Sequence, residues 1–139
     1  MSNYSSPRWS GEIADCSMPM TFDQHSNCSY KCLYCFSQYQ RALGDAKKQY
    51  LSNAVNAVSV EAVKRIFTDP DSSQFGPYVK SRIPMQWGGL SDPFCEHERR
   101  LKTGLELLRF FRSIEYPICF STKSTWWTRD PEYVDLFRG

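Results

Sequence analysis

The sequence predicts an α/β fold made of βα units with parallel strands. Over 139 residues, three short apolar segments with strand character alternate with segments of helical periodicity, and the length suits one domain. Glycines, cysteines and charged residues follow the apolar segments. Because ligands bind at the carboxyl ends of parallel strands, we expect the functional residues on one rim of the sheet.

The first unit follows a segment, residues 1–15, that is rich in Ser, Asn and Pro and is expected to be loose. Residues 16–139 are expected to form the folded core. A strand at Met18–Phe22 leads into a loop with three cysteines. The polar stretch 35–53 is predicted to be a helix or helical turn that breaks near Gly44.

The second unit has a helix that starts after Ser59 as N-cap and ends before Pro70. A strand at Ile83–Trp87 follows, and two glycines end it.

The third unit begins with a helix over residues 96–113, whose apolar stripe is predicted to be core. A strand within residues 116–124 comes next. The last helix starts after Asp130 as N-cap, with Pro131 in its first position. The stripe consists of Leu101, Leu105, Leu108 and Phe111.

Composition indicates which partners and which cellular compartment to expect. A net charge of +2, from 17 basic and 15 acidic residues, gives no global reason to expect a polyanionic partner. We find no apolar run long enough for a membrane span and no secretory leader, so a cytoplasmic protein is expected. In a reducing compartment, the six cysteines indicate metal binding or catalysis more than disulfides.

Three of the cysteines have the spacing C-x3-C-x2-C, at Cys28, Cys32 and Cys35. Structural zinc is usually closed by four protein ligands. A cubane iron–sulfur cluster normally takes one thiolate per iron, so three cysteines leave one iron open for another molecule. A zinc site completed by His25, Cys16 or Cys95 is the alternative.

With Tyr34 just before the last cysteine, this loop resembles the signature of radical S-adenosylmethionine (SAM) enzymes. Two further segments, "GGLSDPFCEHE" and "FSTKSTWWTRD", resemble the spore photoproduct lyase-like branch of that family. The resemblance covers roughly residues 18–137. The matched positions are Gly88, Gly89, Ser91, Asp92, Pro93, Phe94, Glu98, Thr122, Lys123, Ser124, Arg129 and Asp130.

The resemblance implies a fold, cofactors and a reaction. The fold is the N-terminal half, about three βα units, of a partial (β/α)6 barrel with parallel strands. The cofactors are a [4Fe-4S] cluster on the three cysteines and SAM, which the cluster cleaves reductively to a 5′-deoxyadenosyl radical. An electron donor such as flavodoxin or ferredoxin is implied as partner. The chain is expected to be truncated after its third unit and need not be active alone.

The resemblance also implies contacts to SAM. The backbone at Gly88 and Gly89 would approach the amino group, Tyr34 would lie near the adenine, and Lys123 would suit the carboxylate. Ser91 belongs to the same cofactor-binding rim. Asp92 and Glu98 either bind polar groups of SAM or substrate or orient the loop.

The substrate stays open. The hydrogen-donating cysteine of spore photoproduct lyases would fall at Gly89, so DNA repair is only one candidate. The competing function is a non-catalytic zinc or iron–sulfur module for nucleic-acid or protein interaction.

Other conspicuous residues receive structural interpretations. Cys95 and Cys119 are expected to be inert small hydrophobes, with Cys119 in the core, and His25 and His97 to have surface or capping roles. Trp126 and Trp127 are expected to pack under a loop more than to stack on bases. A solvated basic face is expected from Lys80, Arg82, Arg99, Arg100 and Lys102.

Overall fold

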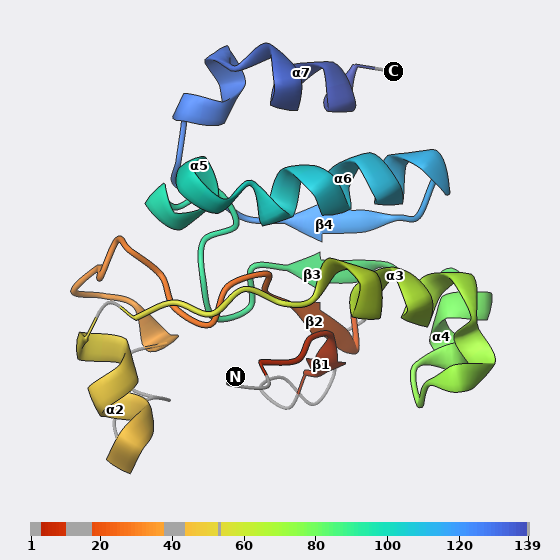
Figure 1. Cartoon of the computed structure of the whole chain (residues 1–139), viewed down its shortest axis with the longest axis horizontal. Helices are drawn as coiled ribbons and strands as arrows, with labels where there is room; N and C mark the ends of the chain where they lie inside the picture. Colours follow the sequence, from red (N-terminus) through yellow and green to blue (C-terminus); the bar gives the residue numbers. More distant parts are fainter. Residues whose placement is uncertain (1–3, 11–17, 38–43, 53, 139) are drawn as a thin grey trace.

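The computed structural model describes residues 4–10, 18–37, 44–52 and 54–138. Its centre is an open sheet of four strands in the order β1-β2-β3-β4 (Figure 1). β2, β3 and β4 are parallel, as predicted, and β1 pairs antiparallel with β2. The strands are β1 at Arg8–Trp9, β2 at Met20–Phe22, β3 at Met85–Trp87 and β4 at Ile118–Phe120.

The three predicted strands are therefore confirmed with shorter bounds. β1 was not predicted, and it lies in the segment that was expected to be loose. The described helices are α2 at Gly44–Leu51, α3 at Val60–Thr68, α4 at Gly76–Lys80, α5 at Glu96–Leu101, α6 at Thr103–Ser113 and α7 at Pro131–Phe137, with 3-10 turns η1 at Pro70–Ser72 and η2 at Trp126–Arg129.

Two helix starts follow the predicted capping chemistry. The Ser59 hydroxyl accepts a hydrogen bond from the Ala62 amide at 3.3 Å at the start of α3. The Asp130 carboxylate accepts one from the Glu132 amide at 3.0 Å, and Pro131 opens α7. Both side chains satisfy amides that have no partner inside the helix. The helix predicted within 35–53 is found from Gly44 onward, and residues 38–43 lie outside the described residues.

The core lies where α3 and α6 pack on β2 and β3 (Figure 1). Phe111 of α6 is at its centre. Its ring centroid lies 6.4 Å from that of Phe22, 5.7 Å from that of Trp87 and 4.9 Å from that of Phe67 on α3. These edge-on contacts join the helices to both inner strands, so the ends of β2 and β3 are held in place.

The opposite face of the sheet carries Thr21, Gln86 and Cys119, which lie in register across three strands. Cys119 is exposed. The prediction that it lies in the core is wrong, because successive residues of a strand point to opposite faces and the core takes Ile118 and Phe120 instead.

Residues 96–113 form two helices, α5 and α6, where one was predicted. The chain turns at Lys102, which has a left-handed backbone with φ of 53°. The Glu98 carboxylate accepts hydrogen bonds from the Gly104 and Leu105 amides, both at 2.8 Å, and so caps α6 from within α5. Leu101 consequently leaves the apolar stripe and is 37% exposed.

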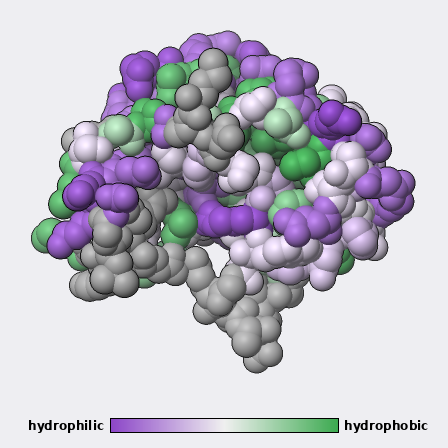
Figure 2. Space-filling view, turned by 60° about the horizontal axis from the view of Figure 1, so that its bottom comes forward, coloured by the Kyte–Doolittle hydropathy of each residue, from purple (hydrophilic) through white to green (hydrophobic). Residues whose placement is uncertain are grey.

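The surface is mixed in character. On the face in Figure 2, green hydrophobic residues are interspersed with purple hydrophilic ones. A membrane-spanning helix is not found in the part of the chain that the structure describes.

Candidate functional site

A cavity of about 400 Å³ lies at the carboxyl ends of the parallel strands. The loop after β2, residues 27–37 (the cysteine loop), forms one side of it, and the segments after β3 and β4 form the others. Except for Glu98, the residues predicted to bind the cluster or SAM line this one cavity. They are Cys28, Cys32, Tyr34, Cys35, Gly88, Gly89, Ser91, Asp92 and Lys123.

Hydrogen bonds fasten the cysteine loop to the segment after β3. The Asp92 amide donates to Cys28 Sγ at 3.5 Å, and the Glu96 amide donates to the Ser29 hydroxyl at 3.0 Å. Ser37 donates to the Leu90 carbonyl at 2.9 Å. The two segments, about sixty positions apart in the sequence, are thus held as one wall.

Asn27 anchors the start of the cysteine loop. It is almost fully buried, and its side-chain amide donates to carbonyls of Gln49, at 2.9 Å, and Ala54, at 3.1 Å. Its carbonyl oxygen accepts from the Cys28 amide at 2.9 Å and from Lys31 Nζ at 2.7 Å. The sequence analysis missed Asn27, although an asparagine that directly precedes a tight loop is a common local hydrogen-bonding device.

The three cysteines are half-buried and carry free thiols. In the described ranges, no three His, Cys, Asp or Glu side chains gather as a single metal ion would require. Thiolates around one zinc ion lie roughly 4 Å apart. A cubane cluster binds each thiolate through a separate iron and so spreads them more widely. All three cysteines line the same open cavity.

Cys95 is buried, and its thiol is hydrogen bonded to that of Cys28. This bond is the main reason why the pKa of Cys28 is raised and that of Cys95 is lowered, and burial adds to the rise at Cys28. Cys16, another of the three residues considered as a fourth ligand, lies outside the described residues.

Lys123 reaches across the cavity to the cysteine loop. Its ammonium donates to Cys32 Sγ at 2.6 Å and to the Tyr34 hydroxyl at 2.7 Å, and it lies 4.6 Å from the centroid of the Tyr34 ring. The hydrogen bond to Cys32, followed by that to Tyr34, raises the pKa of Lys123. The cavity therefore contains a fixed positive charge beside one predicted cluster ligand.

Two roles were considered for Asp92, contact with SAM or substrate and orientation of the loop, and its hydrogen bonds favour the second. Its carboxylate accepts hydrogen bonds from the Thr122 hydroxyl at 2.6 Å, the Lys123 amide at 2.8 Å and the Phe94 amide at 2.9 Å. These bonds tie the segment after β3 to the segment after β4. Most acceptor positions of this carboxylate are thus used within the protein.

Asp23, at the end of β2, supports the same rim and was missed by the sequence analysis. Its buried carboxylate accepts from both terminal nitrogens of Arg8, at 3.0 and 2.8 Å, and from the amides of Leu90 and Ser91. The Ser91 hydroxyl also donates to it at 3.0 Å. Burial raises the pKa of Asp23, whereas Arg8 and these donors oppose the rise. Arg8 sits on the unpredicted strand β1, so sequence patterns gave no signal for the pair.

Both glycines after β3 are explained by crowding within the protein. Gly88 has φ of 97°, which disfavours side chains. A Cβ at Gly89 would lie 2.1 Å from Thr21 Oγ1. The fold therefore requires a residue without a side chain at both positions. The missing side chains also leave room in the cavity.

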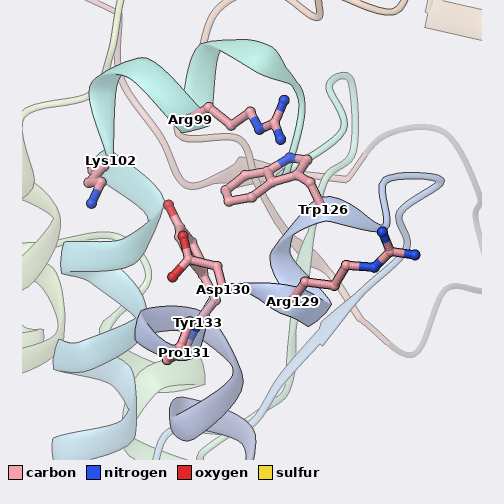
Figure 3. Close-up of a pocket in the computed structure, with 7 residues that line it drawn as sticks. All are labelled: Arg99, Lys102, Trp126, Arg129, Asp130, Pro131 and Tyr133. Atoms are coloured by element: carbon pink, nitrogen blue, oxygen red, sulfur yellow. The ribbon is translucent and has the colours of Figure 1, made fainter.

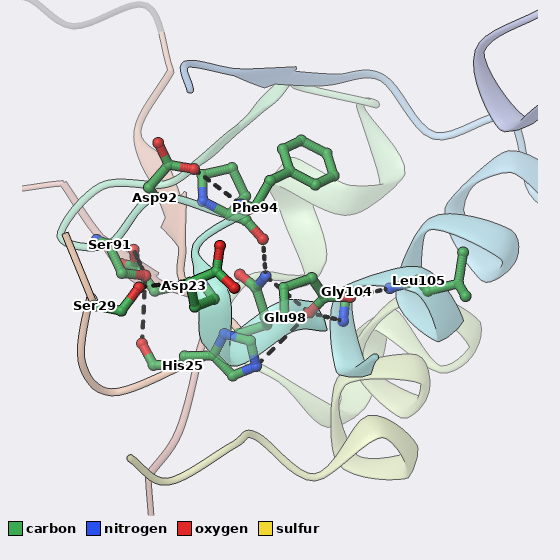
Figure 4. Close-up of polar contacts among 12 residues, drawn as sticks. Asp23, His25, Ser29, Ser91, Asp92, Phe94, Glu98, Gly104 and Leu105 are labelled. Carbon is green, nitrogen blue, oxygen red and sulfur yellow. Dashed lines mark hydrogen bonds and ion pairs between the residues drawn. The ribbon is translucent and has the colours of Figure 1, made fainter. Parts of the chain in front are cut away.

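Behind the cavity lies a buried polar network around Glu98 (Figure 4). Besides the amides at the start of α6, Glu98 accepts from the Tyr133 hydroxyl at 2.8 Å and from Gln24 Nε2 at 3.3 Å. Gln24 in turn accepts from the Trp87 indole at 2.8 Å. Glu98 is completely buried, so of the two roles considered for it, the structure favours the orienting one.

His25 belongs to this network. It is completely buried, with Nε2 3.7 Å from Glu98 Oε2, so the prediction of a surface or capping role is wrong. Its ring lies 6.2 Å from that of His97, which is half-buried. Burial lowers the pKa of His97.

The remaining interpretations hold. Trp127 stacks on Phe94 with ring centroids 4.7 Å apart, and Trp126 packs against Tyr133 at 4.9 Å. Both indoles are partly buried against the core. The basic side chains are largely exposed; Lys80, Arg99 and Lys102 form ion pairs at the surface.

Comparisons with protein-family models, curated proteins and solved structures find no match for this chain.

Proposed function

We propose that this protein holds a [4Fe-4S] cluster on Cys28, Cys32 and Cys35 and binds SAM in the cavity beside them. The observation that carries the proposal is the convergence of all the implied ligands. They come from three separated stretches of sequence and line one cavity of about 400 Å³. In the same proposal, the open parallel sheet is the N-terminal half of a partial (β/α)6 barrel.

The cluster, when bound, would supply the electron that cleaves SAM to a 5′-deoxyadenosyl radical, for which a donor of the flavodoxin or ferredoxin type is needed. The protein's own task is to bind and orient. Lys123 provides a compact positive charge for the SAM carboxylate. Asp92 and Asp23 position the backbone that lines the cavity. We place this activity in a reducing cytoplasmic compartment and leave the substrate open.

One observation favours the zinc module as second candidate. The Cys95 thiol is hydrogen bonded to that of Cys28, so Cys95 is the candidate for a fourth thiolate among the described residues. A site closed in this way has no open position for SAM. The non-catalytic function therefore predicts stoichiometric zinc and no response to SAM.

The decisive experiment is anaerobic reconstitution with iron and sulfide. We expect about four irons and four sulfides per chain and an EPR spectrum of the reduced protein that changes when SAM is added. Cys32→Ala should lose the cluster. Cys119→Ala is the matched control, because this thiol is exposed on β4 and does not line the cavity, and it should retain full iron content.

Two results would contradict the proposal. Stoichiometric zinc with an EPR-silent sample would favour the structural module. Equal iron loss in both cysteine variants would show that iron binding does not depend on the cysteines that line the cavity.

A further inference from the structure

Cys28 and Cys95 form a thiol pair beside the cysteine loop. Cys28 is half-buried and lines the cavity, whereas Cys95 is completely buried and directly precedes α5. The two thiols are hydrogen bonded to each other. The cluster proposed above uses Cys28 as a ligand and leaves Cys95 without a role.

Hydrogen bonds on either side of the pair hold the two segments together. The residues that follow the two cysteines are joined, because the Glu96 amide donates to the Ser29 hydroxyl at 3.0 Å. Asp92 links the cysteines themselves: its amide donates to Cys28 Sγ at 3.5 Å, and its carbonyl accepts from the Cys95 amide at 3.2 Å. A disulfide joins only residues whose Cα atoms lie within about 7 Å of each other, so it needs segments that are already neighbours. This pair meets that need.

The other described cysteines have different surroundings. Cys32 Sγ accepts a hydrogen bond from Lys123 Nζ at 2.6 Å, which holds this sulfur toward the segment after β4. Cys35 is half-buried and lines the cavity, and Cys119 is exposed on β4. Among the described cysteines, it is Cys95 whose thiol contacts that of Cys28.

A small oxidant can reach this pair through the cavity beside the cysteine loop. That cavity has a volume of about 400 Å³, and Cys28 is part of its lining. The larger cavity between α5, η2 and α7, of about 630 Å³, is lined by Arg99, Trp126 and Tyr133 among other described residues, none of them a cysteine (Figure 3). Cys28 is thus the thiol that meets the oxidant, and the buried Cys95 lies next to it.

We propose that Cys28 and Cys95 form a reversible disulfide when the cluster site is empty and hydrogen peroxide is present. The consequence for the cluster rests on the function proposed above. With Cys28 in a disulfide, only Cys32 and Cys35 remain as thiolates, and a cubane that normally takes one thiolate per iron is not assembled. The disulfide also keeps Cys28 from irreversible oxidation to the sulfinic acid.

Hydrogen peroxide is the oxidant in this reaction. The Cys28 sulfur attacks one peroxide oxygen, the O–O bond breaks, and a sulfenic acid and water form. The Cys95 sulfur then attacks the Cys28 sulfur, the S–O bond breaks, and a second water leaves with the Cys95 proton. The two thiols lose two electrons and two protons, and the peroxide is reduced to two waters. A thiol reductant reverses the disulfide by exchange.

The test maps disulfides in the full chain, reduced and freed of metal, after treatment with equimolar hydrogen peroxide and alkylation of the remaining thiols. Trypsin leaves Cys16 and Cys28 on one peptide, residues 9–31, so the mapping uses the Cys16→Ser variant. We expect mass spectrometry without reduction to find this peptide joined to residues 83–99, which carry Cys95.

Two further substitutions and an iron assay complete the test. Cys95→Ser should abolish the cross-link. Cys119→Ser is the matched control and should leave it unchanged, because this thiol is exposed and does not line the cavity. Iron uptake by the oxidised protein should fall from about four irons per chain to nearly none, and it should return after reduction with dithiothreitol.

Two outcomes would overturn the proposal. They are a predominant disulfide between other cysteines, such as Cys32 and Cys35, and a Cys28–Cys95 disulfide that leaves iron uptake unchanged. The mapping requires neither iron nor SAM. A cross-link in a protein that takes up no iron even when reduced would therefore contradict the cluster and leave the disulfide, whereas iron uptake without the cross-link would contradict the disulfide alone.

Discussion

The residues on the rim of the cavity beside the cysteine loop differ from the residues behind this rim in burial and in hydrogen bonding. On the rim, Tyr34 is 81% exposed and Lys123 is exposed, and their side chains contact each other across the cavity. Behind the rim, Asp23 and Glu98 are completely buried and their carboxylates accept hydrogen bonds from several donors. The side chains proposed to bind ligand are thus left accessible, while buried carboxylates position the rim.

This difference predicts separable effects of mutation. A buried carboxylate that satisfies several backbone amides cannot be removed without leaving those amides unpaired. An exposed side chain on the rim contributes little to folding, so its loss should affect ligand binding alone. Three substitutions, each with a control, test this separation.

Glu98→Ala should have the largest effect on stability. It leaves the Gly104 and Leu105 amides and the Tyr133 hydroxyl without their acceptor, and we expect a loss of about 3–5 kcal/mol in the free energy of unfolding. Denaturant unfolding followed by circular dichroism measures it. Glu106→Ala, on the exposed side of α6, is the control and should unfold almost like the parent. Equal stability of the two variants would contradict the structural role of Glu98.

Gly89→Ala should have an intermediate effect, about 1–3 kcal/mol, because its Cβ would meet Thr21 Oγ1. Thr21→Ala removes that oxygen. The double variant should therefore be more stable than the sum of the two single losses predicts, with a coupling energy of about 1 kcal/mol. Strict additivity in this double-mutant cycle would mean that crowding by Thr21 does not explain Gly89.

Lys123→Met should have the smallest effect on stability, less than about 0.5 kcal/mol, because the side chain is exposed. On reconstituted protein, it should weaken SAM binding about tenfold or more through loss of one charged hydrogen bond. Lys47→Met, at an exposed position of α2, controls for the lost charge. A Lys123→Met protein with unchanged SAM affinity would remove Lys123 from the proposed site.

Local patterns were sufficient for much of the fold. The caps at Ser59 and Asp130 were predicted because capping depends on residues within one helical turn. The parallel strands followed from apolar segments that alternate with helices. The break between α5 and α6 was not predictable in this way, because a buried carboxylate from one helix overrides the continuous helical period of residues 96–113.

The candidate site likewise contains residues that could be predicted from local patterns and residues that could not. Its proposed ligands carry motif spacing, so Cys28, Cys32, Cys35 and Lys123 could be selected from the sequence. Asp23 and the burial of His25 could not, because their roles depend on partners more than sixty positions away or on a strand too short to leave a pattern.

Near neighbours in the chain were enough to predict the order of the three parallel strands, two helix caps and the motif residues that line the candidate site. Which carboxylates are supports, and where one predicted helix becomes two, could be seen only in the folded chain. Those features arise from burial and from contacts between distant segments, which local spacing does not encode.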